Sequence, residues 1–297
     1  MTDPAALCDY EGHDYRTRFW GQGREYEDRA ERIALRRLLP PNGQRLAEIG
    51  AGFGRLADLY HGYQQVILLD PARSLLLEAR EMLGQDPRFL YVRGDANNLP
   101  LADGACDTLV MVRVMHHLPE VPRALGELAR SLCSGGIFVG EYANKRNVKA
   151  IGRYLLRRQP WSPFASEPVE FAPLHFDFHP IWMAERLREA GLRSEQELAV
   201  STFRLPLLKR LVPAPLLAGI DGLLQPLGRY CKLSPSVFVR AMRAAVTAGS
   251  PPPLPENPFR CPACHAAPLA ADDGALACHT CGRRWPITDG IYDFGEQ

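Results

Sequence analysis

The stretch RLAEIGAGFGRL (45–56) decides the fold, because a short apolar run passes directly into a turn that holds three glycines. Gly50, Gly52 and Gly54 allow a sharp backbone turn and let a ligand approach more closely than a Cβ would permit. About 20 residues later, Asp70 closes the next strand-like run, where its carboxylate can accept hydrogen bonds from both hydroxyls of a ribose. The stretch therefore predicts a strand–turn–helix unit that binds a nucleoside.

The spacing of the glycines separates two classes of ligand. Dinucleotide folds use G-x-G-x-x-G, and the helix that follows holds a pyrophosphate at its N-terminus. This chain has G-x-G-x-G, preceded by the acid Glu48. A carboxylate at the turn repels a pyrophosphate but suits a ligand with a cationic end and no phosphate, such as S-adenosylmethionine. A nicotinamide-dependent oxidoreductase is the alternative that this spacing disfavours.

Outward from the turn, apolar strands alternate with amphipathic helices. This alternation is typical of a doubly wound α/β fold with a mostly parallel sheet. Helical patterns cover residues 26–39, 55–62, 74–83 and 121–132. We expect seven strands, at residues 45–49, 65–70, 88–94, 107–112, 136–142, 193–202 (the weakest run) and 236–242.

Two segments interrupt this rhythm. Residues 145–180 fit no periodic element and carry six basic and three acidic residues, so we interpret them as a lid or substrate wall, or else a surface excursion. Residues 205–230 are rich in leucine and predict helices that pack on the core. Their alternatives are an apolar substrate cover or a contact with a membrane surface. The predicted packing face comprises Leu216, Ile220, Leu223, Leu224 and Leu227.

The chain divides into three predicted parts. Residues 1–246 form the α/β domain, and the proline-rich stretch 247–258 is a stiff linker. Residues 259–297 hold four of the eight cysteines.

Composition limits the cellular compartments and the binding partners that we expect for this protein. Lys and Arg number 35 against 34 Asp and Glu, so no overall field attracts nucleic acid or an anionic membrane. The first 20 residues lack the pattern of a signal peptide, and no apolar run reaches the ~18 residues of a membrane span. The four other cysteines are scattered singly, which indicates a reducing compartment. We therefore expect a soluble cytoplasmic protein.

The clustered cysteines have the spacing C-x2-C-x13-C-x2-C. Two C-x-x-C knuckles can close a tetrahedral four-thiolate site that selects zinc and leaves no open position for catalysis. We predict a structural zinc ribbon, with an iron–sulfur or redox-dithiol site as the alternative. Its ligands are Cys261, Cys264, Cys278 and Cys281.

Four motifs in order resemble class I S-adenosylmethionine-dependent methyltransferases, in the branch that acts on quinones, lipids and other small molecules. They are AEIGAGFGRL (47–56), LLDPARSLLLEAR (68–80), RGDANNLPLADGACDTLVMVRVMHHL (93–118) and LARSLCSGGIFVGEYA (128–143). The resemblance implies that Asp70 takes the ribose hydroxyls, Asp95 and Ala96 flank the adenine, and Pro71 and Arg113 also lie at the cofactor. It also implies that the methionine part is lined by Glu48, Gly50, Ala51, Gly52 and Gly54. The lead-in YRTRFW (15–20) would close over the carboxylate end.

The tail RRWPITDGIYDF (283–294) resembles small zinc-ribbon proteins that activate methyltransferases, although those usually carry a proline where this chain has Tyr292. Residues 261–297 hold two basic residues against five acidic ones, which makes the ribbon a poor binder of phosphates. We expect the ribbon to dock on the methyltransferase domain of its own or a neighbouring chain. An independent module is the alternative.

Methyl transfer is an in-line displacement, and it needs a general base only when the acceptor carries a proton of high pKa. Candidate bases are His116, His117, Glu141, His175 and His179, of which the His116–His117 pair is also typical of structural roles. The predicted function is methyl transfer to a small-molecule or lipid-like acceptor. The alternatives are an RNA methyltransferase and a non-catalytic cofactor-binding protein.

Overall fold

The central sheet of the body has seven strands and is mostly parallel, as the sequence predicts. The computed structural model describes residues 23–244 and 253–295. The pairings from β3 through β2, β1 and β4 to β5 are parallel, whereas β9 is antiparallel to both of its neighbours, β5 and β8. The strand order is β3 (Phe89–Arg93), β2 (Tyr63–Asp70), β1 (Gly43–Ile49), β4 (Cys106–Met111), β5 (Leu132–Ala143), β9 (Ser236–Arg243) and β8 (Leu192–Val200).

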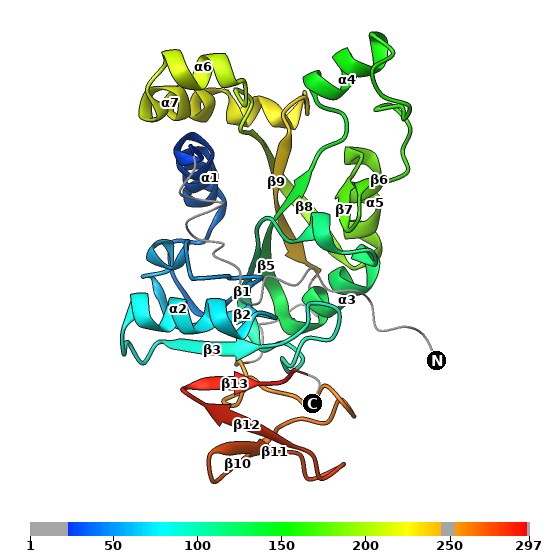
Figure 1. The fold of residues 1–297 in the computed structure, drawn as a ribbon. Helices are drawn as coiled ribbons and strands as arrows, with labels where there is room; N and C mark the ends of the chain where they lie inside the picture. The colour runs from blue at the N-terminus through cyan, green and yellow to red at the C-terminus, as the bar shows by residue number, and fades with distance from the viewer. Residues whose placement is uncertain (1–22, 245–252, 296–297) are drawn as a thin grey trace.

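Helices cover both faces of this sheet (Figure 1). Successive strand residues point to opposite faces, so Ala47 and Ile49 enter one buried cluster while Leu46 enters the other. The first cluster is covered by α3 (Val121–Ser131) and α5 (Pro180–Glu189), and the second by α1 (Glu25–Leu38) and α2 (Arg73–Leu83).

The helix predicted at 55–62 is wrong, since the structure has only the 3-10 turn η2 (Ala57–Leu59) there. The chain is already turning back toward β2. At Gly62, an added Cβ would lie 2.0 Å from the carbonyl oxygen of Pro41. The close approach of these two backbones leaves no room for another helical turn.

Residues 145–180 contain regular elements that the sequence analysis did not predict. Helix α4 (Val148–Leu155) begins at Asn147, whose side chain accepts a 2.9 Å hydrogen bond from the N–H of Ala150. A hairpin of β6 (Val169–Ala172) and β7 (His175–Asp177) follows. These elements are too short to show a clear period in the sequence.

Residues 205–230 form α6 (Pro206–Leu211), α7 (Ala214–Leu224) and the 3-10 helix η4 (Gln225–Arg229). The predicted packing face is wrong, because all five of its apolar residues are exposed. Helix α7 instead meets α1 through a face of small and polar residues. Gly222 lies against Ile33, and Asp221 accepts a 3.1 Å hydrogen bond from the hydroxyl of Tyr26. Close helix contact and buried hydrogen bonds thus decide the orientation.

The C-terminal ribbon continues the central sheet (Figure 1). Its four strands are β10 (Ala270–Asp272), β11 (Ala275–Ala277), β12 (Arg284–Thr288) and β13 (Ile291–Asp293), each antiparallel to the next. Strand β13 pairs in parallel with β3, so the sheet has eleven strands within the described residues. The described end of the proline-rich stretch also lies along the body, where Ala102 donates its N–H to the carbonyl of Pro258 (2.7 Å).

Candidate cofactor site and cysteine cluster

A cavity lies where β1, β2 and β4 end, at the edge of the sheet where parallel α/β folds bind ligands. Of the cofactor residues that the sequence predicts, all but Gly54 and Asp95 line it. The lining comprises Glu48, Ile49, Gly50, Ala51, Gly52, Phe53, Arg55, Leu56, Leu69, Asp70, Pro71, Leu75, Ala96, Asn97, Val112, Arg113, Val114, His117, Leu118 and Pro119.

The three glycines of the first turn have different roles. A Cβ at Gly50 would lie 2.1 Å from Cγ2 of Val114, so only glycine fits between β1 and the segment after β4. Gly52 has a φ of +55° and no atom within 4 Å of its Cβ position, which leaves space for a ligand. Gly54 instead lies against Ala79 of α2 and brings the turn close to that helix.

Two acidic side chains face the cavity. Glu48 is 3% exposed, and its Oε2 has no hydrogen-bond partner among the described residues. Burial raises the pKa of Glu48 to about 8, although the positive charge of Arg55 opposes the shift. Asp70 accepts hydrogen bonds from the N–H groups of Gly52 (2.8 Å) and Ala72 (2.9 Å), so it also holds the glycine turn and the start of α2.

A buried carboxylate that the sequence did not predict lies behind this cavity. Glu31 of α1 is buried and pairs with two lining residues, Arg55 (2.8 Å) and Arg113. The guanidinium groups hold the pKa of Glu31 below its usual value although burial opposes this. Arg113 has a φ of +60°, and its N–H donates to Glu141 (3.0 Å), so both contacts fix a backbone shape that costs energy outside glycine. The sequence did hold a signal for this site, since the charged residue Glu31 lies between Ala30 and Ala34 of the predicted apolar face.

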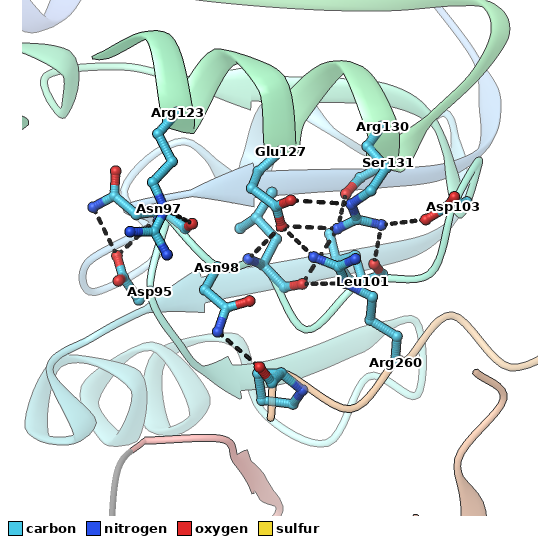
Figure 2. Close-up of polar contacts among 12 residues, drawn as sticks. Asp95, Asn97, Asn98, Leu101, Asp103, Arg123, Glu127, Arg130, Ser131 and Arg260 are labelled. Atoms are coloured by element: carbon cyan, nitrogen blue, oxygen red, sulfur yellow. Dashed lines mark hydrogen bonds and ion pairs between the residues drawn. The ribbon is translucent and has the colours of Figure 1, made fainter. Parts of the chain in front are cut away.

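Asp95 supports its own turn rather than lining the cavity. Its carboxylate accepts hydrogen bonds from the backbone N–H (2.9 Å) and the side-chain amide (3.2 Å) of Asn97 (Figure 2). Asn97 and Ala96 are the residues of this turn that reach the cavity. The lead-in YRTRFW (15–20) lies outside the described residues.

Of the five predicted bases, only His117 lines the cavity. Its Nδ1 lies 3.0 Å from the carbonyl oxygen of Leu174, so Nδ1 carries the proton and Nε2 is the basic nitrogen. Burial lowers the pKa of His117, which keeps the ring neutral at pH 7. His175 lies edge-on to this ring with centroids 4.8 Å apart, whereas His116 is packed behind it.

The two other predicted bases have structural partners. His179 begins α5, and its Nδ1 accepts the N–H of Ile181 at 3.3 Å. Glu141 is buried on β5 and accepts the N–H of Arg113. Neither lines the cavity.

The four clustered cysteines converge as a metal site requires. Their sulfur atoms all lie within 4.8 Å of one another. Cys261 and Cys281 are 3.7 Å apart at sulfur, and Cys264 and Cys278 are 3.4 Å apart. Sulfur atoms bound to one zinc at ~2.3 Å lie ~3.8 Å apart, so the donor set and its size fit a zinc ion.

The ribbon contacts the body through ion pairs. Arg260 donates to Oε2 of Glu127 at 2.6 Å, and Arg130 donates to the same oxygen at 3.0 Å (Figure 2). Two of the acidic ribbon residues also find partners on the body. Asp289 pairs with Arg73 (2.7 Å) and Asp293 with Arg93 (3.3 Å). Within the ribbon, Tyr292, which departs from the activator pattern, packs on Phe259 with ring centroids 4.9 Å apart.

Replacing Glu127 by alanine is expected to destabilise the contact between ribbon and body by about 3 kcal/mol, because Arg260 would stay buried without its carboxylate. Faster hydrogen exchange at the β13 amides would measure the loss. Glu120→Ala, at an exposed position before α3, is the control and should change nothing. Unchanged exchange at β13 in the Glu127 variant would contradict the role of this ion pair.

Comparisons with known proteins agree with this fold. Residues 47–140 match the family described as a methyltransferase domain, and residues 260–290 match the Trm112p-like proteins. A chain from the complex between the Haloferax volcanii Trm112 methyltransferase activator and a methyltransferase superposes with a TM-score of 0.53 at 17% identity, covering 79% of this chain and 96% of the other. A Mesorhizobium loti S-adenosylmethionine-dependent methyltransferase gives 0.53 at 22% identity and covers 72% and 98%. The fold is thus that of S-adenosylmethionine-dependent methyltransferases.

Sequence relatives give the family. Phosphatidylethanolamine N-methyltransferase of Cereibacter sphaeroides is 31% identical over 141 residues, which are 44% of this chain and 70% of the relative. Malonyl-[acyl-carrier protein] O-methyltransferase of Geobacter sulfurreducens is 35% identical over 32% of this chain and 36% of its own. Phthiotriol/phenolphthiotriol dimycocerosates methyltransferase of Mycobacterium leprae is 31% identical over 38% and 42%. The chain belongs to the S-adenosylmethionine-dependent methyltransferases, and it carries a Trm112-like ribbon.

Proposed function

We propose that this protein transfers the methyl group of S-adenosylmethionine to a small-molecule or lipid-like acceptor. The observation that carries the proposal is the pair of acids at the cavity, with Oε2 of Glu48 lacking a hydrogen-bond partner beside the glycine turn and Asp70 at the end of β2. Glu48 would bind the ammonium group, and Asp70 would accept hydrogen bonds from the ribose hydroxyls. The relatives whose names specify an acceptor act on lipids, quinones or acyl-carrier substrates, which supports the acceptor class.

The bound cofactor would supply an activated methyl group, so the chain mainly has to hold donor and acceptor in line and exclude water. Val112, Leu118 and Pro119 give the cavity an apolar wall for this purpose. His117 is the residue that we propose as the base for a hydroxyl or amine acceptor, because its Nδ1–H···O=C bond directs the basic character to Nε2.

The zinc ion is proposed to be structural. Four thiolates complete its coordination and leave no position for an acceptor or water. The ribbon is proposed to dock in cis, where β13 covers the edge of β3 and removes an exposed row of backbone hydrogen-bonding groups. We place the protein in the cytoplasm, where the thiols stay reduced.

A transfer assay tests the function. Purified protein with labelled S-adenosylmethionine is offered a lipid extract, an aqueous metabolite extract and total RNA in parallel. We expect label in the lipid or metabolite fraction. Label in RNA alone would favour the RNA methyltransferase alternative, and cofactor binding without label in any fraction would favour a non-catalytic protein.

The pH dependence of cofactor affinity tests Glu48. Only its carboxylate attracts the ammonium, so with a pKa of about 8 the affinity should weaken by up to about tenfold per pH unit as pH falls below 8. Above pH 8 the amino group of the cofactor loses its proton, since α-amino groups titrate at ~7.7–8.0, and affinity should fall again. Isothermal titration calorimetry from pH 6 to 9 measures this profile.

Glu48→Gln keeps the shape of the side chain and should remove the acidic limb of this profile. Its affinity at pH 8 should be at least about tenfold weaker. The ligand-free variant should be more stable than wild type at pH 8, because a carboxyl whose folded pKa is raised loses stability as pH rises from about 4.5 toward 8. Glu81→Gln, on the exposed side of α2, is the control. Equal affinity of wild type and Glu48→Gln at every pH would exclude the role.

A further inference from the structure

The end of the molecule opposite the ribbon carries α4 on one side and the α6–α7 pair on the other (Figure 1). A backbone hydrogen bond joins the two. The N–H of Val148, at the start of α4, donates to the carbonyl of Leu233, just beyond η4, at 3.0 Å. Asn144 also donates to the carbonyls of Lys232 (3.0 Å) and Ser234 (2.9 Å). We call the residues 145–158 and 201–235 together the distal surface.

The distal surface exposes a large set of apolar side chains. Leu211 is 71% exposed, Leu223 78% and Tyr230 82%, and Leu155 of α4 is 70% exposed. Single exposed leucines are ordinary, but many of them on two segments joined by hydrogen bonds favour an interaction surface. The set comprises Val148, Tyr154, Leu155, Leu156, Leu205, Leu207, Leu211, Leu216, Ile220, Leu223, Leu224, Leu227 and Tyr230.

Positive charge accompanies these apolar groups. Residues 145–158 hold six basic residues and no acid, and residues 201–235 hold five basic residues and one acid, the buried Asp221. The rest of the chain holds 24 Lys and Arg against 33 Asp and Glu, so the near-neutral total hides a strong asymmetry. Seven of these basic residues are exposed, and no carboxylate in the described ranges lies within 4 Å of their charged groups. They are Arg146, Lys149, Arg153, Arg157, Arg158, Arg210 and Arg229.

We infer that the distal surface docks on an anionic lipid bilayer. Exposed leucines on the same segments as arginines without a carboxylate partner suit the boundary between headgroups and acyl chains, where apolar side chains leave water and cations meet lipid phosphates. Among the described residues, no helix has the length and apolarity to cross a membrane, so the contact is peripheral. A nucleic acid would use the arginines but would gain little from the leucines.

Vesicle flotation of the full-length protein tests the inference. The probes are vesicles of phosphatidylcholine alone and of phosphatidylcholine with 30 mol% phosphatidylglycerol. We expect the protein to float with the anionic vesicles, to float at least about tenfold less with the neutral ones, and to be released as salt is raised from 0.05 to 0.5 M.

Two double variants separate the apolar and the charged contributions. Leu211→Ser with Leu223→Ser should weaken vesicle binding at least about tenfold, and Arg157→Glu with Arg158→Glu at least about 25-fold, since each cation near an anionic surface contributes about fivefold. The matched controls lie outside the distal surface. Met82→Ser replaces an exposed apolar residue of α2, and Arg36→Glu with Arg188→Glu reverses two exposed charges on α1 and α5. Both controls should bind vesicles like wild type.

Three outcomes would overturn the inference. The wild-type protein fails to bind the anionic vesicles, or the leucine variant binds them as well as wild type does. In the third, wild type is a dimer and the leucine variant a monomer, which would make the surface a contact between two copies. Cofactor affinity is measured on the same samples and should be unchanged in every variant. A wild-type protein that binds the cofactor but not the anionic vesicles would refute this inference alone, and one that binds the anionic vesicles but not the cofactor would refute only the proposed function.

Discussion

Replacing Cys278 by serine is expected to unfold the ribbon and to expose the edge of β3. The ribbon is small, and its four strands are only three to five residues long, so its folding free energy would come largely from the proposed zinc ion. Structural zinc sites of this kind contribute about 10–16 kcal/mol of binding free energy, far more than the stability of so small a core. Cys278 is a buried member of the cluster, and serine cannot supply a thiolate in its place.

Zinc content and the fluorescence of Trp285 measure this effect. Trp285 is buried against Phe294 with ring centroids 5.5 Å apart, so unfolding of the ribbon should shift its emission to the red. Wild type should bind one zinc ion and the variant almost none, and removal of zinc by a chelator should reproduce the variant. Cys231→Ser, at an exposed cysteine outside the cluster, is the control. Retention of a native ribbon without metal would refute the structural role.

Replacing Asp70 by alanine is expected to weaken the affinity for S-adenosylmethionine by about a hundredfold or more. The carboxylate would accept two hydrogen bonds from the ribose, and each such bond to a charged group contributes about 1.5–3 kcal/mol. The variant also loses the acceptor that holds the N–H of Gly52, so the glycine turn becomes less well ordered. Isothermal titration calorimetry measures the affinity.

Two further variants distinguish recognition from support of the turn. Asp70→Asn keeps one acceptor oxygen and should retain most of the thermal stability while its affinity stays reduced. Asp95→Ala removes an acid that holds its own turn and does not line the cavity, so its effect on affinity should be below about tenfold. An equal loss in the Asp70 and Asp95 variants would mean that the cavity does not hold the ribose at the end of β2.

The sequence by itself determined the parts of this protein that depend on local order. The glycine turn, the acid before it and the acid at the end of the second strand all lie at the cavity, because parallel strands bring their carboxyl ends to one edge of the sheet. The cysteine spacing determined the four-sulfur cluster for a similar reason, since each C-x-x-C turn presents its two sulfurs on the same side.

Only the tertiary structure decided which of several residues that look alike in the sequence line the cavity or pack on the core. Gly54 and Gly52 are alike in sequence, but one lies against α2 and the other opens to the cavity. Helix α7 had an obvious leucine face, yet it packs through Asp221 and Gly222, because buried hydrogen bonds and close backbone contact with α1 outweigh the apolar pattern. The pairing of β13 with β3 joins residues about 200 positions apart, and no local signal specifies which strand edge a ribbon will cover.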